Sequence, residues 1–113
     1  MKYRQLGHSG LFVSELTLGT LTFAGSDGFE KTGNVDAKTA RRFMDIAFEQ
    51  GVNTVDTADL YSKGGAEHVV GEALGRDRQR IILATKARSP MSDDPNDSGA
   101  TRYHLIKSCE NSL

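Results

Sequence analysis

Along the chain, short apolar runs of strand length alternate with longer segments in which apolar residues recur at helical spacing. Short runs of strand length occur at 16–19, 53–56 and 81–85, and each is followed by a segment with helical spacing. The run at 81–85 is apolar over almost its whole length, which is typical of a parallel strand buried on both faces. Strand followed by helix, three times over, predicts an α/β fold with right-handed crossovers in a parallel sheet.

Three helices are expected from apolar residues at helical spacing. The first begins at an N-cap on Asp36 and ends at Gln50, where Gly51 can supply a left-handed stop. The second ends at Gly75, and the third begins near Thr101. Their predicted buried stripes are Ala40, Phe43, Met44 and Ala47; then Ala66, Val69, Val70, Ala73 and Leu74; then Leu105, Ile106, Cys109 and Leu113.

The amino-terminal segment has a different pattern. Residues 1–15 are expected to form a β-hairpin, with strands at 3–6 and 11–13 around a turn that contains two glycines. Residues 16–113 would then hold the three strand–helix units. No sequence repeat or linker divides them, so residues 1–113 are expected to be a single domain.

Composition excludes several classes of protein. The 37% hydrophobic and 26% charged content is ordinary for a soluble globular protein. Fourteen basic and fifteen acidic residues give a net charge of −1, so no overall field favours nucleic acid or an anionic membrane. Residues 1–6 lack the apolar run of a signal peptide, and no stretch approaches the ~20 apolar residues of a membrane span. We expect a cytoplasmic protein that binds neither nucleic acid nor a membrane.

The cysteine and the histidines carry no metal-ligand pattern. Cys109 is the only cysteine, and its place on the third helical stripe favours packing in the core over catalysis. His8, His68 and His104 are scattered without the spacing of metal ligands. No metal site is therefore expected.

Candidate chemistry gathers at one end of the predicted sheet. The connections after the strands are long and polar, whereas those after the helices are short, so the extra length indicates function on one face. Asp56 and Lys86 occupy the last positions of two predicted strands on that face, and Tyr61 lies in the loop after the first. In a barrel of parallel strands, polar residues at the carboxyl ends are typical of catalytic sites.

These three residue types suit carbonyl reduction. A carbonyl that accepts a hydride becomes an alkoxide and needs a proton, and a phenol with an ordinary pKa of about 10 is a reluctant donor. A nearby ammonium favours the phenolate and lowers that pKa. Lys86 can supply the ammonium, and Asp56 can hold it in place. The alternative is an ion pair that merely caps the sheet, with Tyr61 an amphipathic loop residue; position on the sheet favours catalysis.

Several short motifs occur in the order Asp-Thr-Ala-Asp-Leu-Tyr at 56–61, then Gly64, Glu67 and Gly71, then Ala-Thr-Lys at 84–86. These motifs resemble those of a known family, the aldo/keto reductases. The first loop at 22–28 is similar to that of bacterial members, and the resemblance extends over essentially the whole chain. The sequence departs from the family pattern at Ala66, where a serine is common.

The resemblance implies a fold and an activity. Family members are TIM-type (β/α)8 barrels, of which this chain would supply the hairpin and the first three β/α units. They reduce aldehydes and ketones to alcohols with NADPH, less often NADH, so the expected partners are a nicotinamide cofactor and a small carbonyl substrate.

The resemblance also implies roles for individual residues. Tyr61 would be the general acid, Lys86 would lower its pKa, and Asp56 would pair with Lys86 near the nicotinamide ribose. The residues expected to line the cofactor at the first strand end are Gly19, Thr20 and Leu21.

Length qualifies these expectations. A barrel of this type needs about 250 residues, so five strands and the family's catalytic histidine would lie beyond Leu113, and His104 is not given that role. Open sheet edges are prone to pairing, so we expect the chain alone to self-associate and to lack useful turnover. Two other interpretations stay open: a truncated, non-catalytic association module that keeps the scaffold, and a half-barrel completed by another copy or a separate chain.

Overall fold

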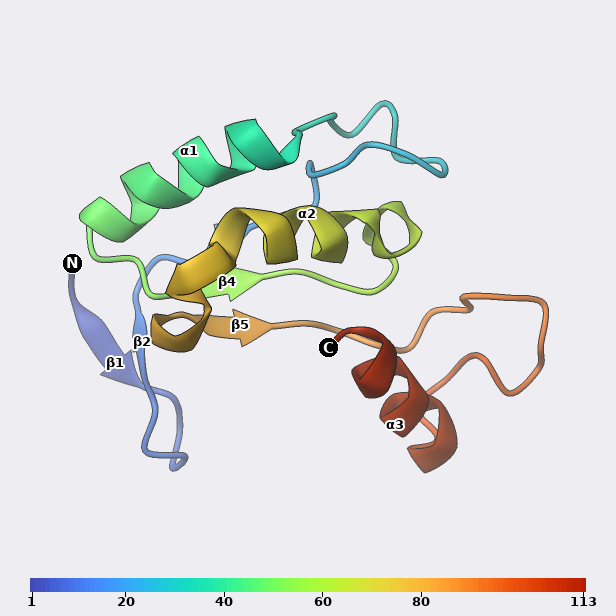
Figure 1. The fold of residues 1–113 in the computed structure, drawn as a ribbon. Helices are drawn as coiled ribbons and strands as arrows, with labels where there is room; N and C mark the ends of the chain where they lie inside the picture. Colours follow the sequence, from blue (N-terminus) through green and yellow to red (C-terminus); the bar gives the residue numbers. More distant parts are fainter.

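A parallel sheet of three strands lies at the centre of the fold (Figure 1). The computed structural model describes residues 1–113. The strands β3 (Leu18–Gly19), β4 (Thr54–Asp56) and β5 (Ile82–Ala84) pair in that order. This confirms the predicted parallel order, although each strand is shorter than its predicted run. β3 and β5 form open edges, so the sheet is part of a barrel and not a closed one.

Two helices cover one face of this sheet. In Figure 1, α1 (Ala37–Glu49) and α2 (Gly65–Leu74) lie side by side above β4. The predicted start of α1 is confirmed, because the Asp36 carboxylate accepts a hydrogen bond from the backbone N–H of Thr39 at 2.8 Å. Gly51 follows with a φ of +86°, as the predicted stop requires. None of the helices is both long and apolar enough to cross a membrane.

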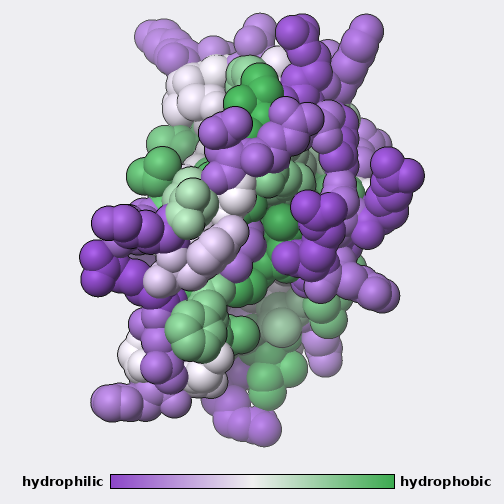
Figure 2. All heavy atoms as spheres, turned by 90° about the vertical axis from the view of Figure 1, so that its left-hand side faces the viewer, coloured by the Kyte–Doolittle hydropathy of each residue, from purple (hydrophilic) through white to green (hydrophobic).

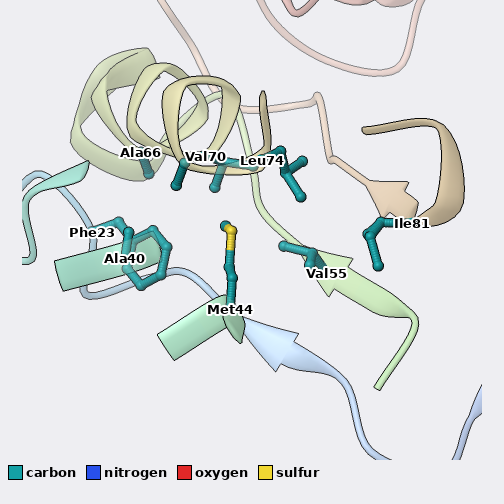
Figure 3. Close-up of a cluster of buried hydrophobic side chains, with 9 residues drawn as sticks. Phe23, Ala40, Met44, Val55, Ala66, Val70, Leu74 and Ile81 are labelled. Carbon is teal, nitrogen blue, oxygen red and sulfur yellow. The ribbon is translucent and has the colours of Figure 1, made fainter. Parts of the chain in front are cut away.

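The hydrophobic core lies between these helices and the sheet. Met44 points from α1 toward Val70 of α2 and Val55 of β4 (Figure 3). Phe43 was predicted to be buried beside Met44 but is 43% exposed, because it lies about 100° around the helix axis from Met44. The buried cluster consists of Phe23, Ala40, Met44, Val55, Ala66, Val70, Ala73, Leu74 and Ile81.

The connection between α2 and β5 is tied to α1 by an arginine. This connection is a 3₁₀ segment, η2 (Gly75–Arg80). Arg41 of α1 donates to the Ala73 carbonyl oxygen at 3.1 Å and pairs with the Asp77 carboxylate at 2.7 Å. One guanidinium therefore satisfies a carbonyl at the end of α2 and fixes the entry to β5.

The predicted hairpin is confirmed, with β1 (Tyr3–Gln5) antiparallel to β2 (Phe12–Ser14). It is fastened to the residue before β4: the Ser14 backbone N–H donates to Asn53 Oδ1 at 2.8 Å, and the Asn53 N–H donates to Ser14 Oγ at 3.1 Å. The hairpin thus lies at the amino end of the sheet. Seen from this side, apolar atoms are exposed among polar ones (Figure 2); Leu11 and Phe12 are 47% and 59% exposed.

The third β/α unit is less covered than predicted. α3 (Arg102–Asn111) follows a long loop after β5, and Figure 1 shows it apart from α1 and α2. Its apolar residues Leu105 and Ile106 are 40% and 41% exposed, and Cys109 is exposed. The predicted burial of that stripe, and of Cys109 in the core, is wrong, because α3 does not pack closely against another helix or strand. Ala84 at the end of β5 is also exposed, so this strand is not buried on both faces.

Polar contacts join α3 to the loop that precedes it. Asp97 accepts hydrogen bonds from Ser92 Oγ at 2.7 Å and from Lys107 Nζ at 3.1 Å. The fully buried His104 places Nδ1 at 3.5 Å from the same carboxylate. The Ser92 hydrogen bond, followed by the Lys107 bond, lowers the pKa of Asp97. Thr101 caps α3 by accepting from the His104 N–H at 3.1 Å, which confirms the predicted start of this helix.

Candidate active site

The carboxyl end of the sheet carries the three residues that the sequence singled out. Asp56 is the last residue of β4, as predicted, and Tyr61 begins the tight turn η1 (Tyr61–Gly64). Lys86 was predicted at the end of its strand but lies two residues beyond β5, because pairing with β4 stops where Ala84 meets Asp56. All three residues nevertheless lie at one rim.

The Lys86 ammonium is the centre of the site. It donates to Asp56 Oδ2 at 2.7 Å, to the Thr57 carbonyl oxygen at 2.7 Å and to the Tyr61 hydroxyl at 3.3 Å. An ammonium has three N–H groups, so each has a partner. The nitrogen also lies 4.9 Å from the centre of the Tyr61 ring. The structure therefore brings together all three predicted residues around one cation.

The charge state of Lys86 follows from two opposing effects. Partial burial by itself lowers the pKa of this ammonium, but the hydrogen bonds and charges of Asp56 and Tyr61 outweigh burial and raise the pKa above 10.5. Lys86 is thus charged at neutral pH. Its side chain is 51% exposed and that of Asp56 is 36% exposed, and an ion pair this open contributes only about 0–1 kcal/mol to stability. The pair positions a charge more than it stabilises the fold.

This arrangement leaves the Tyr61 proton free. Lys86 donates to the phenol oxygen, so the phenol does not need its own proton for that contact. The same cation lies 3.3 Å from the oxygen that would carry the negative charge after proton transfer. A carbonyl oxygen at the rim can therefore accept a proton from Tyr61.

Backbone and side-chain hydrogen bonds hold the segment that carries Lys86. The Asp59 N–H donates to the Lys86 carbonyl oxygen at 3.1 Å, and Thr85 Oγ1 donates to Glu67 Oε1 at 2.6 Å. Glu67 belongs to α2, so the helix orients the residue before the lysine. The sequence showed Glu67 as part of a motif but gave it no role.

Sequence reasoning missed a second feature, the side chain of Ser62. It is 1% exposed and forms hydrogen bonds with Phe23, Gly25 and Ser26 in the loop after β3. These partners lie 36–39 positions away along the chain, so no local spacing could have indicated them.

The residues predicted to line a cofactor differ in their surroundings. Gly19 pairs with Asp56 across the sheet, and a Cβ added to it would meet no atom within 4 Å, so a ligand can approach its backbone. Leu21 is 42% exposed. Thr20 is fully buried, and both its N–H and its hydroxyl donate to the Asp56 carbonyl oxygen at 3.1 Å. The hydroxyl of Thr20 is thus engaged within the protein.

Comparison with known proteins agrees with this geometry. Residues 15–113 match the sequence model of the aldo/keto reductase family. The chain belongs to this family.

Two similar proteins carry names of different kinds, one of an oxidoreductase and one of a channel subunit. The chain is 39% identical over 124 residues to the "Uncharacterized oxidoreductase YrpG" of Bacillus subtilis, covering 100% of this chain and 36% of that protein. It is 34% identical over 116 residues to the "Probable voltage-gated potassium channel subunit beta" of Oryza sativa subsp. japonica, covering 100% of this chain and 33% of that protein.

Solved structures of the family superpose on the chain. The holo form of aldo-keto reductase AKR11C1 from Bacillus halodurans matches with a TM-score of 0.80 and 38% identity, over 100% of this chain and 35% of that one. An aldo-keto reductase from Klebsiella pneumoniae in complex with NADPH matches with a TM-score of 0.66 and 28% identity, over 92% of this chain and 31% of that one. The chain therefore spans about a third of the length of these relatives. The solved structures imply a TIM-type barrel for the parent protein.

Proposed function

We propose that this chain supplies the proton-donating half of an aldo/keto reductase site, which reduces an aldehyde or ketone to an alcohol with NADPH. The supporting observation is the contact of one ammonium, Lys86 Nζ, with both the Asp56 carboxylate and the Tyr61 hydroxyl. We take residues 1–113 as one incomplete barrel domain of that enzyme, with the hairpin at 1–15.

In this proposal each residue has one task. Tyr61 gives its proton to the carbonyl oxygen as charge develops there. Lys86 stays charged throughout, since its pKa is raised, and stabilises the phenolate that remains. Asp56 holds the ammonium at 2.7 Å and keeps it from turning away into solvent.

The residues at the first strand end fit the nicotinamide end of a cofactor. Gly19 has open space beside its backbone, and the Asp56 carboxylate next to it is 36% exposed, so it can accept hydrogen bonds from ribose hydroxyls. With Thr20 and Leu21 they form the proposed cofactor-binding segment. When bound, the cofactor supplies the hydride. The Klebsiella pneumoniae neighbours in complex with NADPH and with NADP support NADPH, with NADH as the less common choice.

The 113 residues alone are proposed to lack useful turnover and to self-associate. The sheet has open edges at β3 and β5, and apolar residues such as Ile106 are exposed. The open rim also leaves Lys86 in contact with water, which weakens its effect on the phenol. An exposed free thiol at Cys109 suits the reducing environment of the cytoplasm, which we propose as the compartment.

A second candidate function is a non-catalytic association module that keeps the family's scaffold. The relative from Oryza sativa, which is named as a potassium channel subunit, supports this second candidate. Under that function, replacing the phenol of Tyr61 would leave association with a partner unchanged. Under the first function the same replacement would strongly lower carbonyl reduction, so one substitution separates the two candidates.

The test uses a complete barrel in which residues 1–113 replace the matching segment of the Bacillus halodurans reductase. Tyr61→Phe is expected to lower kcat for carbonyl reduction by roughly 10²-fold or more, because the proton donor is lost. NADPH binding, measured by fluorescence titration, should be nearly unchanged.

Tyr103→Phe is the matched control, because Tyr103 lies on α3 and is 67% exposed. This variant should retain the activity of the unsubstituted barrel. Equal turnover of the Tyr61→Phe and Tyr103→Phe barrels would remove Tyr61 from the acid role.

A further inference from the structure

The turn that follows the proposed proton donor is held in an unfavourable conformation. Ser62 has φ 50° and ψ 35°, and Lys63 has φ 47° and ψ 51°. Both lie in the left-handed region of φ and ψ, which residues other than Gly, Asn and Asp rarely adopt. Two successive residues of this kind persist only where other contacts fix them.

Those contacts come from the Ser62 hydroxyl. Its oxygen accepts hydrogen bonds from the backbone N–H groups of Gly25 at 3.1 Å and Ser26 at 3.2 Å, and the hydroxyl donates to the Phe23 carbonyl oxygen at 3.3 Å. A hydroxyl has one donor and two acceptor positions, so its capacity is fully used. The side chain is 1% exposed, so water cannot replace it.

The loop that Ser62 holds is itself ordered. The Ala24 N–H donates to the Val35 carbonyl oxygen at 2.9 Å, and the Val35 N–H donates to the Thr22 carbonyl oxygen at 3.1 Å. Residues 22–35 therefore fold back on themselves as a unit, and whatever fixes one end of the loop fixes its position at the site.

Close packing shows that this unit is seated on the turn after Tyr61. A Cβ added to Gly65, at the start of α2, would lie 3.1 Å from the Ala24 Cβ, so the two backbones approach closely. From the same loop, the ring of Phe29 reaches Tyr61, with ring centres 6.4 Å apart and an angle of 59° between the planes.

We propose that Ser62 is a positioning residue for the reduction: its hydroxyl docks loop 22–35 onto the turn that carries Tyr61. Phe29 and Tyr61 are then held at a fixed spacing at the rim where the carbonyl would bind. Ser62 does not touch the reacting atoms. The inference rests on the proposed reductase function, and it assigns the loop at 22–35 to substrate placement through a buried contact that does not involve the reacting atoms.

The first test measures docking on the chain itself. Ser62→Ala removes all three hydrogen bonds, so exchange of the Ser26 amide hydrogen, followed by NMR, should accelerate about tenfold. Lys63→Ala is the matched control, because Lys63 has the same backbone conformation but an exposed side chain. Exchange at Met44 in the core should be unchanged in both variants.

The second test uses the complete barrel described above. Ser62→Ala is expected to lower kcat by about 10- to 100-fold, since small displacements of positioned groups have effects of this size, while NADPH affinity and the activity of Lys63→Ala stay unchanged. Ser62→Gly separates the hydroxyl from backbone strain, because glycine tolerates a positive φ. If the hydroxyl matters, Ser62→Gly loses activity as Ser62→Ala does.

Four results would overturn the inference. Unchanged Ser26 exchange in Ser62→Ala would show that the loop is not docked by this residue. Unchanged kcat beside an inactive Tyr61→Phe barrel would leave the reductase function intact and remove Ser62 from it. Full activity of Ser62→Gly would assign the effect to strain. Faster exchange at Met44 in both Ser62 variants would make Ser62 a residue of general stability.

Discussion

The forces that hold α1 and α2 to the sheet differ from those that hold α3 to its loop. In the first two β/α units, α1, α2 and β4 enclose a core of apolar side chains, including the fully buried Met44 and Leu74. In the third unit, α3 exposes its apolar residues and meets its own loop through the polar group of His104, Asp97 and Lys107. Apolar contact is non-directional, whereas hydrogen bonds fix orientation.

The candidate site spans this division. Asp56 and Tyr61 come from the closely packed part, whereas Lys86 comes from the strand and loop of the third unit. Lys86 is joined to the packed part by directional bonds, from the Asp59 N–H to its carbonyl oxygen and from Thr85 to Glu67. The geometry of the cation thus depends on a few hydrogen bonds more than on packing.

The largest effect is expected from a truncation in the hydrophobic core. Met44→Ala should lower the free energy of unfolding by about 2–5 kcal/mol, because it opens a cavity among fully buried side chains. Ile106→Ala on α3 is the matched truncation, and it should change stability by no more than about 0.5 kcal/mol, because Ile106 is 41% exposed.

Urea unfolding of the two variants, followed by circular dichroism, measures both values. Similar losses for Met44→Ala and Ile106→Ala would mean that the two regions do not differ in packing.

A smaller and local effect is expected when the third unit loses its carboxylate charge. Hydrogen bonds from Ser92 and Lys107 hold the pKa of Asp97 below its ordinary value of 3.8. The ionised form therefore stabilises the fold fully above pH 3.8, and this contribution disappears as the pH falls through the lowered pKa. Below that range the amide signals of α3 should broaden in NMR spectra before those of α1.

Asp97→Asn is the control for this acid transition, since it keeps an acceptor but cannot titrate. In that variant α3 should show no separate change on acidification. Simultaneous loss of α1 and α3 signals in the unsubstituted chain would contradict a local role for Asp97.

The smallest expected effect concerns a buried carboxyl beside the site. Burial raises the pKa of Asp59 above 3.8, and its Oδ2 has no hydrogen-bond partner. The folded state thus favours the protonated form, so stability from this group is present at low pH and is lost as the pH rises through the raised pKa. Asp59→Asn should increase stability at neutral pH by about 1 kcal/mol or less and leave it unchanged in acid. Thermal melting at two pH values checks this, and a loss at neutral pH would contradict it.

Local signals in the sequence were sufficient for the element order and several boundaries. Asp36 and Thr101 cap their helices as predicted, because an N-cap depends on hydrogen bonds within four residues. Asp56, Tyr61 and Lys86 meet as predicted, because parallel strands place their carboxyl ends at one edge.

Burial and long-range hydrogen bonds could not be predicted in the same way. The stripe of Leu105, Ile106 and Cys109 has the correct period for a buried face, but periodicity does not show whether anything covers it. Nothing near Ser62 in the sequence distinguishes it from other loop serines, because its partners Gly25 and Ser26 are brought to it only by the fold. Partners of this kind are determined by tertiary structure alone.

The fastening of the hairpin to Asn53 has a practical consequence. Ser14 and Asn53 exchange two hydrogen bonds at the amino end of β4, whereas the chemistry is proposed at the opposite end of the same strand. A dye, affinity tag or surface linker attached at the turn between β1 and β2 would therefore report on or immobilise the protein without obstructing the rim. Single-molecule and biosensor experiments on this protein can begin from that attachment point.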